Sequence, residues 1–439
     1  MQPINVTHND TDARTPSAQA RWATHVAVPA AVAGYPLLEA LRTCCVQTAP
    51  GAPAYGRAPF NTFGHSARPW TDRDRDIVTP ANDLLYSNAW VDLREGPVLL
   101  DVPAATGRYF VVELLDVYTN NFCNLGTRNV PADGARYALL GPDTPDAAAP
   151  AGSVPLRCPT ALVWVLCRVL VDGEGDVPAA RGFQSGFVLT GAVPAAPPAS
   201  IARWQEGGDA ALDFYANLAR ALADFPPPES ERGVYALLGN VHVRLQADGG
   251  LGDLRPAVVE GLREAHATAT ALIEGHTRSV SKAAWRFSTR LGRYRSDLML
   301  RAATAWKGLG ALAADEAIYA LADYDRDGAP LDGSRRYTLC FADGGDLPAD
   351  AFWSISLYGA DRYFAANDIG RHALGNRSAL ERAADGSLTL EVSHARPLGP
   401  ECNWLPAPDG PFYLILRLYH PQPQLFEGRY RFPDLEHVA

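Results

Sequence analysis

Lysine is almost missing from this 439-residue chain. Lys282 and Lys307 are the only two, and arginine supplies nearly all the cations of a sequence with a formal net charge of −10. No basic stripe is present, so we expect no binding to nucleic acid, in which cationic side chains neutralise phosphates. Long apolar runs are missing as well. No stretch of 18 apolar residues occurs, which argues against a membrane-spanning helix.

Cysteine is sparse and shows no pairing pattern. The seven cysteines are scattered, odd in number and include the adjacent Cys44 and Cys45, and no C-x-x-C motif occurs. We therefore expect reduced thiols and a cytoplasmic protein. The polar residues at the start of the chain contain no apolar core of a secretory signal, so we expect a flexible arm over residues 1–22.

Several motifs that carry known chemistry are also absent. The chain has no G-x-S-x-G, G-x-x-x-x-G-K-[ST], H-E-x-x-H or G-x-G-x-x-G motif. No two of its ten histidines stand at metal-ligand spacing, so we expect no metal site and no cofactor. Asp323, Asp325 and Asp327 match the first half of a calcium loop, but Ser334 stands where a glutamate is needed. A plain turn is the simpler interpretation, and calcium binding stays an open question.

Periodic patterns predict the fold class. Short segments with alternating apolar and polar residues recur about every ten residues, separated by Gly and Pro turns. Apolar residues three and four apart predict helices over residues 24–47 and in a middle segment. We predict a mainly β protein with α elements: two antiparallel, jelly-roll-like β-sandwich domains joined by a helical segment. The predicted parts are the arm 1–22, the N-terminal sandwich with its leading helix 23–200, the helical segment 201–316 and the C-terminal sandwich 317–439.

A series of motifs resembles a known family. The N-terminal half contains "NTFGH" (61–65), "TPANDLLYS" (79–87) and "GRYFVVELLDVYTNNFCNLGTR" (107–128). The C-terminal half contains "AFWSISLY", "NWLPAP" and "FYLILRLYHP". In this order they resemble a two-domain family known only as domains of unknown function 1254 and 1214. The resemblance spans nearly the whole chain and implies paired β-sandwiches, often oligomeric, but it names no reaction.

Polar groups crowd the start of one predicted strand. Asn82 and Asp83 precede the strand, and Tyr86 lies on it. Ordinary turn chemistry explains such residues, because short polar side chains bond to nearby main-chain groups. The alternative is a ligand cavity, since each polar atom left unpaired in a packed seam costs about 1–3 kcal/mol. His65 is either a loop residue or a general base with an ordinary pKa near ~6.5. The candidate catalytic residues are Asp83, Tyr86 and His65.

Other residues are candidates for binding a substrate. Arg417 lies in an otherwise apolar strand and needs an anion, which is either a carboxylate of the protein or one of a ligand. Arg128 is suited to a substrate carboxylate, and a structural ion pair is the alternative for Asp116 and Arg128. Trp404 is either a lid or a packing plug. The candidate substrate-binding residues are Asn82, Trp90, Asp116, Tyr118, Arg128, Asn403, Trp404 and Arg417.

Two classes of function fit these residues. The first, which we favour, is a cofactor-independent enzyme that transfers protons on a small, largely apolar organic molecule, in secondary metabolism for example. A lyase- or hydrolase-type step fits best, and isomerisation is also compatible. The second is a non-catalytic β-sandwich protein that binds a small ligand or forms an oligomer. In both cases we expect a small-molecule partner and a homo-oligomer, a dimer or tetramer, and neither nucleic acid nor membrane.

Overall fold

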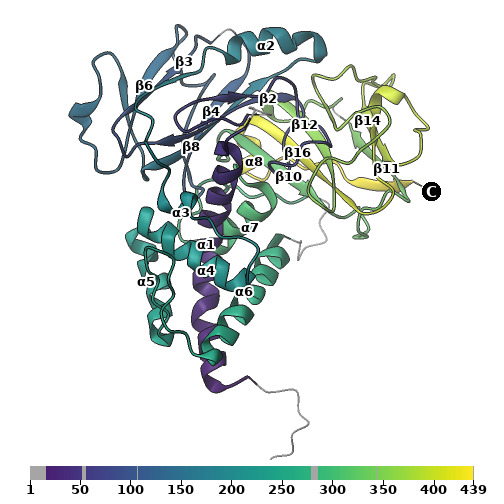
Figure 1. Ribbon diagram of the computed structural model, residues 1–439. Helices are drawn as coiled ribbons and strands as arrows, with labels where there is room; N and C mark the ends of the chain where they lie inside the picture. Colours follow the sequence, from purple (N-terminus) through teal and green to yellow (C-terminus); the bar gives the residue numbers. More distant parts are fainter. Residues whose placement is uncertain (1–15, 52–55, 106, 278–284, 343, 439) are drawn as a thin grey trace, which may run out of the picture.

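The computed structural model describes residues 16–51, 56–105, 107–277, 285–342 and 344–438 (Figure 1). Most of the predicted arm lies outside these residues, and Ala18–Trp22 form the start of helix α1. The described strands form four sheets that are mostly antiparallel, and none of the four is closed. Helices and sheets together confirm the predicted mixture of β and α elements.

Two of the sheets lie in the N-terminal half. The five-stranded sheet has the order β1-β2-β8-β4-β5, and the four-stranded sheet has the order β7-β6-β3-β9. The strands of the first are Gly64–His65, Leu84–Asp92, Leu162–Leu170, Phe110–Asp116 and Asn121–Gly126. The strands of the second are Val154–Arg157, Ala135–Leu140, Val98–Val102 and Val188–Thr190.

Strand β2 shows why these two sheets stay together. Its apolar side chains Leu85, Ala89 and Val91 share one buried cluster with Leu100 and Leu139 of the four-stranded sheet. The polar and aromatic side chains between them, including Tyr86 and Trp90, belong to a different cluster on the opposite face. The two-residue alternation of the sequence is therefore confirmed, because successive side chains on a strand point to opposite faces.

The C-terminal half repeats this arrangement. One sheet has the order β10-β16-β12-β13, with strands Ala317–Ala322, Phe412–Pro421, Ala349–Gly359 and Ala373–Gly375. The other has the order β15-β14-β11-β17, with strands Trp404–Pro406, Leu388–Ser393, Arg336–Phe341 and Leu435–Val438. Strand β16 turns Leu414, Leu416 and Leu418 toward the second sheet. Its other face carries Arg417 and Tyr419 and points toward the N-terminal half.

The larger helices pack together and extend from the sheets (Figure 1). Helix α1, predicted over 24–47, spans Ala18–Thr48 and packs lengthwise on α6 (Pro256–Thr277). A Cβ atom on Gly261 of α6 would lie 2.5 Å from the main-chain oxygen of Ala20, so the missing side chain lets the two helices approach closely. The other helices are α2 (Val177–Gln184), α3 (Ala199–Ala202), α4 (Ala210–Asp224), α5 (Arg232–Ala236), α7 (Leu298–Gly308) and α8 (Pro423–Phe426).

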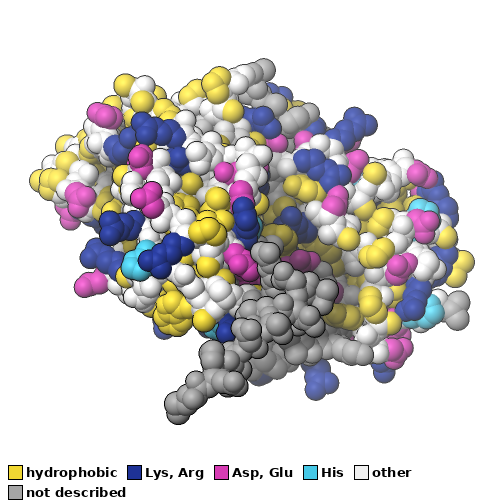
Figure 2. Space-filling model, turned by 60° about the horizontal axis from the view of Figure 1, so that its bottom comes forward, with side chains coloured by type: hydrophobic (Ala, Val, Ile, Leu, Met, Phe, Trp, Pro, Cys, Tyr) yellow, Lys and Arg dark blue, Asp and Glu magenta, His cyan; other side chains and the backbone are white. Residues whose placement is uncertain are grey.

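Two surface properties bear on the expected partners. No helix within the described residues has both the length and the apolar character needed to cross a bilayer. On the face in Figure 2, basic and acidic side chains lie interspersed.

Candidate ligand-binding cavity

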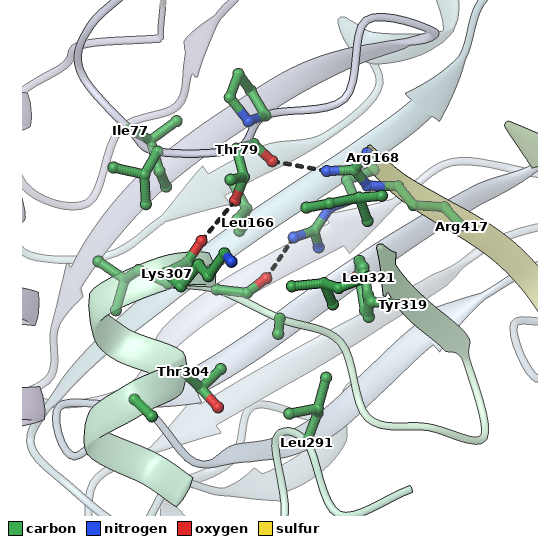
Figure 3. A pocket seen from close by; sticks show the side chains of 18 of the residues that line it. Ile77, Thr79, Leu166, Arg168, Leu291, Thr304, Lys307, Tyr319, Leu321 and Arg417 are labelled. Carbon is green, nitrogen blue, oxygen red and sulfur yellow. Dashed lines mark hydrogen bonds between the residues drawn. The ribbon is translucent and has the colours of Figure 1, made fainter. Parts of the chain in front are cut away.

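A cavity of about 340 Å³ lies between the five-stranded sheet and the sheet that contains β16 (Figure 3). Helix α7 and the segments 77–80 and 286–291 complete its wall. Its size is at the lower end of the range of small-molecule sites, roughly 300–1,000 Å³. Apolar side chains make up much of the wall: Ile77, Leu166, Leu291, Leu300, Leu321 and Ile415.

Arg417 is the most unusual polar group in this wall. The residue is 3% exposed, and its Nη2 donates to the main-chain oxygen of Thr79 at 2.7 Å. Its Nη1 donates to the Ser356 hydroxyl at 3.0 Å. Both acceptors are neutral, and no carboxylate of a described residue lies within the 4.0 Å of an ion pair. Because a guanidinium does not lose its proton in proteins, a cation is buried here with no carboxylate of a described residue in ion-pair contact.

Thr79 is held in a strained conformation at the same place. Its φ angle is +49°, in the left-handed region that a β-branched residue rarely adopts. Its N–H donates to the Arg362 oxygen at 3.0 Å, and its hydroxyl donates to the Lys307 oxygen at 3.0 Å. Together with Arg417, these contacts fix the conformation from three sides. Strain that is maintained in this way is typical of functional sites.

Three further cations line the cavity, namely Arg168, Lys307 and Arg286, and all three have acidic partners. Arg168 of β8 donates to Glu113 Oε2 at 2.6 Å and to the Gly310 oxygen at 2.5 Å (Figure 3). Lys307 of α7 lies 3.0 Å from Asp323 Oδ1. Asp323 also pairs with Arg286, so Lys307 and Arg286 share one carboxylate, whereas among the described residues Glu113 pairs with Arg168 alone. Arg417 differs from all three because it makes no ion-pair contact with a carboxylate of a described residue.

The three predicted catalytic residues do not meet in one place. Tyr86 lines the cavity, and its hydroxyl accepts from the Ala81 N–H at 2.9 Å. Asp83 is partly buried, and its Oδ1 is sealed from solvent with no hydrogen-bond partner among the described residues. Burial raises the pKa of Asp83, and the Ser354 hydroxyl and Arg417 oppose that shift. Both residues thus lie at or beside the cavity.

His65 lies elsewhere. Strand β1 pairs with β2 so that His65 faces Ser87, which belongs to the sheet face opposite Tyr86. The exposed imidazole contacts the Ser87 hydroxyl through Nδ1 at 2.8 Å and stacks on Phe63. The structure therefore does not bring His65 to the cavity.

Four of the predicted substrate-binding residues bond to the protein itself. Asn82 Nδ2 donates to the Trp70 oxygen at 2.5 Å. Trp90 donates to Gln47 Oε1 at 2.9 Å and stacks on Trp164. The Tyr118 hydroxyl donates to the Phe225 oxygen at 2.7 Å. Asp116 accepts from the Asn120 N–H at 2.9 Å, and burial raises its pKa to about 6. None of these four is among the described residues that line the cavity.

The ion pair suggested for Asp116 and Arg128 takes another form. Arg128 is paired, but with Glu316, whose Oε2 it reaches at 2.5 Å. Glu316 also accepts from the Tyr109 hydroxyl at 2.8 Å and contacts His420 Nε2 at 3.1 Å. The Glu316 carboxylate therefore bonds to Tyr109 and Arg128 of the N-terminal half and to His420 of the C-terminal half.

The last two candidates lie at the edge of the outer C-terminal sheet: Asn403 ends the 3-10 turn Glu401–Asn403, and Trp404 begins strand β15. Asn403 Nδ2 donates to the Glu381 oxygen at 2.7 Å, and Trp404 Nε1 donates to the Ser393 oxygen at 3.0 Å. Trp404 is 3% exposed and lies outside the cavity wall, so it packs in the protein rather than covering the cavity. Of the eight substrate-binding candidates, only Arg417 lines the cavity.

Several cavity residues were missed by reading the sequence. Arg168 stands in the apolar strand "LVWVLCRVL", the same pattern that drew attention to Arg417, and that pattern is the signal that would have identified it. Tyr419 shares the strand face of Arg417 and could have been found from it, whereas Lys307 and Tyr319 have no comparable local signal. Their positions depend on how the two halves pack.

The aspartates of the calcium-like segment take part in the fold. Asp323 pairs with Arg286 and Lys307. Asp325 Oδ1 accepts from the N–H groups of Asp327 at 3.0 Å and Ala329 at 2.8 Å, as in an ordinary Asx-type turn. Among the residues with described positions, no group of three or more His, Cys, Asp or Glu side chains is arranged to hold a metal ion.

Fold and cavity together define a β-rich protein with a ligand-sized cavity between its two halves. Residues 60–191 match the family described as "Protein of unknown function (DUF1254)", and residues 316–423 match "Protein of unknown function (DUF1214)". The chain therefore belongs to the two-domain family that its motifs predicted.

Two solved structures are similar to this chain. The VPA0106 protein from Vibrio parahaemolyticus shares 21% identity over 95% of this chain and 100% of its own, with a TM-score of 0.67, which shows a common fold. An uncharacterized protein from Burkholderia cenocepacia shares 12% identity over 92% of this chain and 87% of its own, with a TM-score of 0.47. No curated protein matches the sequence.

Proposed function

We propose that the cavity binds a small organic acid, with the carboxylate at Arg417 and a largely apolar body along the remaining wall. The observation that carries this proposal is the buried Arg417 guanidinium, which donates to neutral groups, the Thr79 oxygen and the Ser356 hydroxyl, and forms no ion pair with a described residue. A buried cation without a counter-ion is unfavourable, and a ligand carboxylate supplies one. The apolar side chains of the wall favour a ligand that buries hydrocarbon.

A second candidate function is acid–base catalysis on that ligand. It is favoured by Asp83, whose sealed, unpartnered carboxyl oxygen belongs to the charge environment of Arg417. In this proposal Asp83 takes a proton from the substrate and Tyr86 donates to the developing oxyanion, in a lyase- or hydrolase-type step or an isomerisation. His65 has no part in it, because it lies on the other sheet face.

Binding is tested by calorimetric titration of octanoate and its neutral analogue octanamide. We expect the wild-type protein to prefer the acid by about ten-fold or more, because a charge-assisted hydrogen bond contributes about 1.5–3 kcal/mol. Arg417→Gln should abolish that preference. Equal affinity of the wild-type protein for the acid and the amide would refute the proposal.

The matched control is Arg301→Gln. Arg301 is 1% exposed, and Glu231 holds it with two hydrogen bonds of 2.8 and 2.7 Å, away from the cavity wall. This variant loses a buried guanidinium as Arg417→Gln does, so it measures the general cost of such a change. It should be less stable but should keep the preference for octanoate over octanamide.

Catalysis is tested separately with Asp83→Asn and Tyr86→Phe. If the protein is an enzyme, both variants lose turnover of a substrate found among organic acids while the Asp83→Asn variant keeps its Tm. If the protein only binds, these changes alter affinity modestly. Unchanged turnover in both variants would exclude these two residues as the acid and base.

Several finer expectations remain part of this proposal. We propose that each half is a jelly-roll-like β-sandwich, which the buried clusters shared between paired sheets support. The homo-oligomer, the cytoplasmic location and a place in secondary metabolism stay predictions.

A further inference from the structure

Three tyrosines line the cavity, and their hydroxyl groups differ. That of Tyr86 accepts from the Ala81 N–H at 2.9 Å, and that of Tyr319 accepts from the Leu312 N–H at 3.2 Å. The Tyr419 hydroxyl makes no hydrogen bond to any described residue, although Tyr419 is only 1% exposed. A buried Tyr hydroxyl usually finds a partner, so this one is placed to bond to something inside the cavity.

Packing fixes the ring of Tyr419. It stacks on Phe352 with ring centroids 4.1 Å apart and planes 12° apart, and it meets the edge of Tyr109 at 5.3 Å. Burial raises the pKa of the Tyr419 hydroxyl well above its ordinary value, so the group stays protonated and can donate. Its position is therefore set before any ligand arrives.

Tyr419 and Arg417 are neighbours on one face of β16. They are two residues apart on a strand, which places their Cα atoms about 7 Å apart with side chains on the same side. Both line the cavity. If the ligand carboxylate binds Arg417, the Tyr419 hydroxyl lies beside an atom that is a few covalent bonds away from the carboxylate in an extended ligand.

We propose that Tyr419 donates a hydrogen bond to a second oxygen of the ligand, which makes the ligand an oxygenated organic acid such as a 4-oxo acid. This inference rests on the proposed function, since Arg417 must hold the carboxylate. It adds a specificity-determining residue and a narrower ligand class. The carbonyl oxygen of the ligand accepts a hydrogen bond from the phenol, and no covalent bond is broken or formed.

The test is a calorimetric comparison of 4-oxooctanoate with octanoate on the same protein samples. The wild-type protein should bind 4-oxooctanoate about five-fold more tightly, as a single neutral hydrogen bond allows. Tyr419→Phe should reduce that ratio to about one while leaving the affinity for octanoate unchanged. Because the readout is a ratio measured in one sample, a partly inactive preparation does not alter it.

Tyr413→Phe is the matched control. Tyr413 lies on the same face of β16, but its hydroxyl is sealed without a partner and the residue is outside the cavity wall. This variant should keep the five-fold ratio. A wild-type ratio of one, or a ratio that survives Tyr419→Phe, would overturn the role of Tyr419 even while octanoate is still preferred over octanamide. Loss of that last preference in the wild-type protein would instead overturn the proposed function, and this inference with it.

Discussion

Nη2 of Arg417 lies 2.7 Å from the main-chain oxygen of Thr79. This hydrogen bond joins a cation of the C-terminal sheet to a strained residue that precedes the first long strand of the N-terminal half. The cavity wall is thus held together by groups from both halves.

Thr79→Val removes the hydroxyl that donates to the Lys307 oxygen and keeps the branched side chain. We expect it to lower the free energy of unfolding by about 1 kcal/mol, measured by urea denaturation. Thr79→Gly should cost less than Thr79→Val, because glycine adopts the positive φ without strain. Thr127→Val is the control, since the Thr127 hydroxyl is buried without a partner and its removal should cost little. A larger loss for Thr79→Gly than for Thr79→Val would contradict the strain at residue 79.

Glu113→Gln removes the charge that balances Arg168 while both residues remain buried. We expect a loss of about 3–5 kcal/mol in the free energy of unfolding, because the guanidinium is left without its counter-ion. The same change leaves the Arg168 charge unbalanced in the cavity wall, so octanoate should bind more tightly. The double variant Glu113→Leu/Arg168→Met should recover most of the stability and lose the gain in affinity. Equal stability of Glu113→Gln and the wild-type protein would argue against the buried ion pair.

Asp116 should make the protein less stable as the pH rises. Burial raises its pKa to about 6, above its value in the unfolded chain. The folded state then binds more protons between about pH 4 and pH 6, so stability falls across that window by about 3 kcal/mol and stays lower above it. Asp116→Asn removes this contribution. The difference in unfolding free energy between variant and wild type should therefore grow from pH 4 to pH 6.5. A difference that does not change with pH would refute the raised pKa of Asp116.

Two neighbouring alanines of α7 test the cavity itself. Ala303 lines the cavity, whereas Ala302 is fully buried in the surrounding core. Ala303→Leu should fill empty space, keep or raise the Tm and weaken octanoate binding. Ala302→Leu should lower the Tm, because extra methylenes in a packed core cost about 1–3 kcal/mol. A similar loss of stability in both variants would mean that the cavity has no room for a ligand.

Local patterns predicted the elements better than the site. Alternation along β2 and β16 assigned the faces of both strands, and it marked Arg417 as a cation in need of an anion. The sequence did not reveal that these two polar faces point toward each other, because their packing depends on contacts between residues more than 300 positions apart, such as Arg417 and Thr79. The ion pair weighed for Arg128 exists, but its partner could not be named for the same reason, since Glu316 lies 188 residues away.

His65 illustrates a second limit. It was named with Asp83 and Tyr86 because an imidazole is a common general base. The pairing of β1 with β2 places His65 opposite Ser87, and a shift of one residue would have put it on the face of Tyr86. The register between β1 and β2 depends on both strands, so it cannot be predicted from either segment alone.

The cavity wall is built from both matched regions of the chain, which limits how the gene can change. Segment 77–80 and strand β8 lie within the first matched region, whereas β10 and β16 lie within the second. Neither region alone encloses the hollow, so a truncated gene product would offer only an open trough to solvent. We therefore expect evolution to keep the two coding regions joined wherever the small molecule matters to the organism.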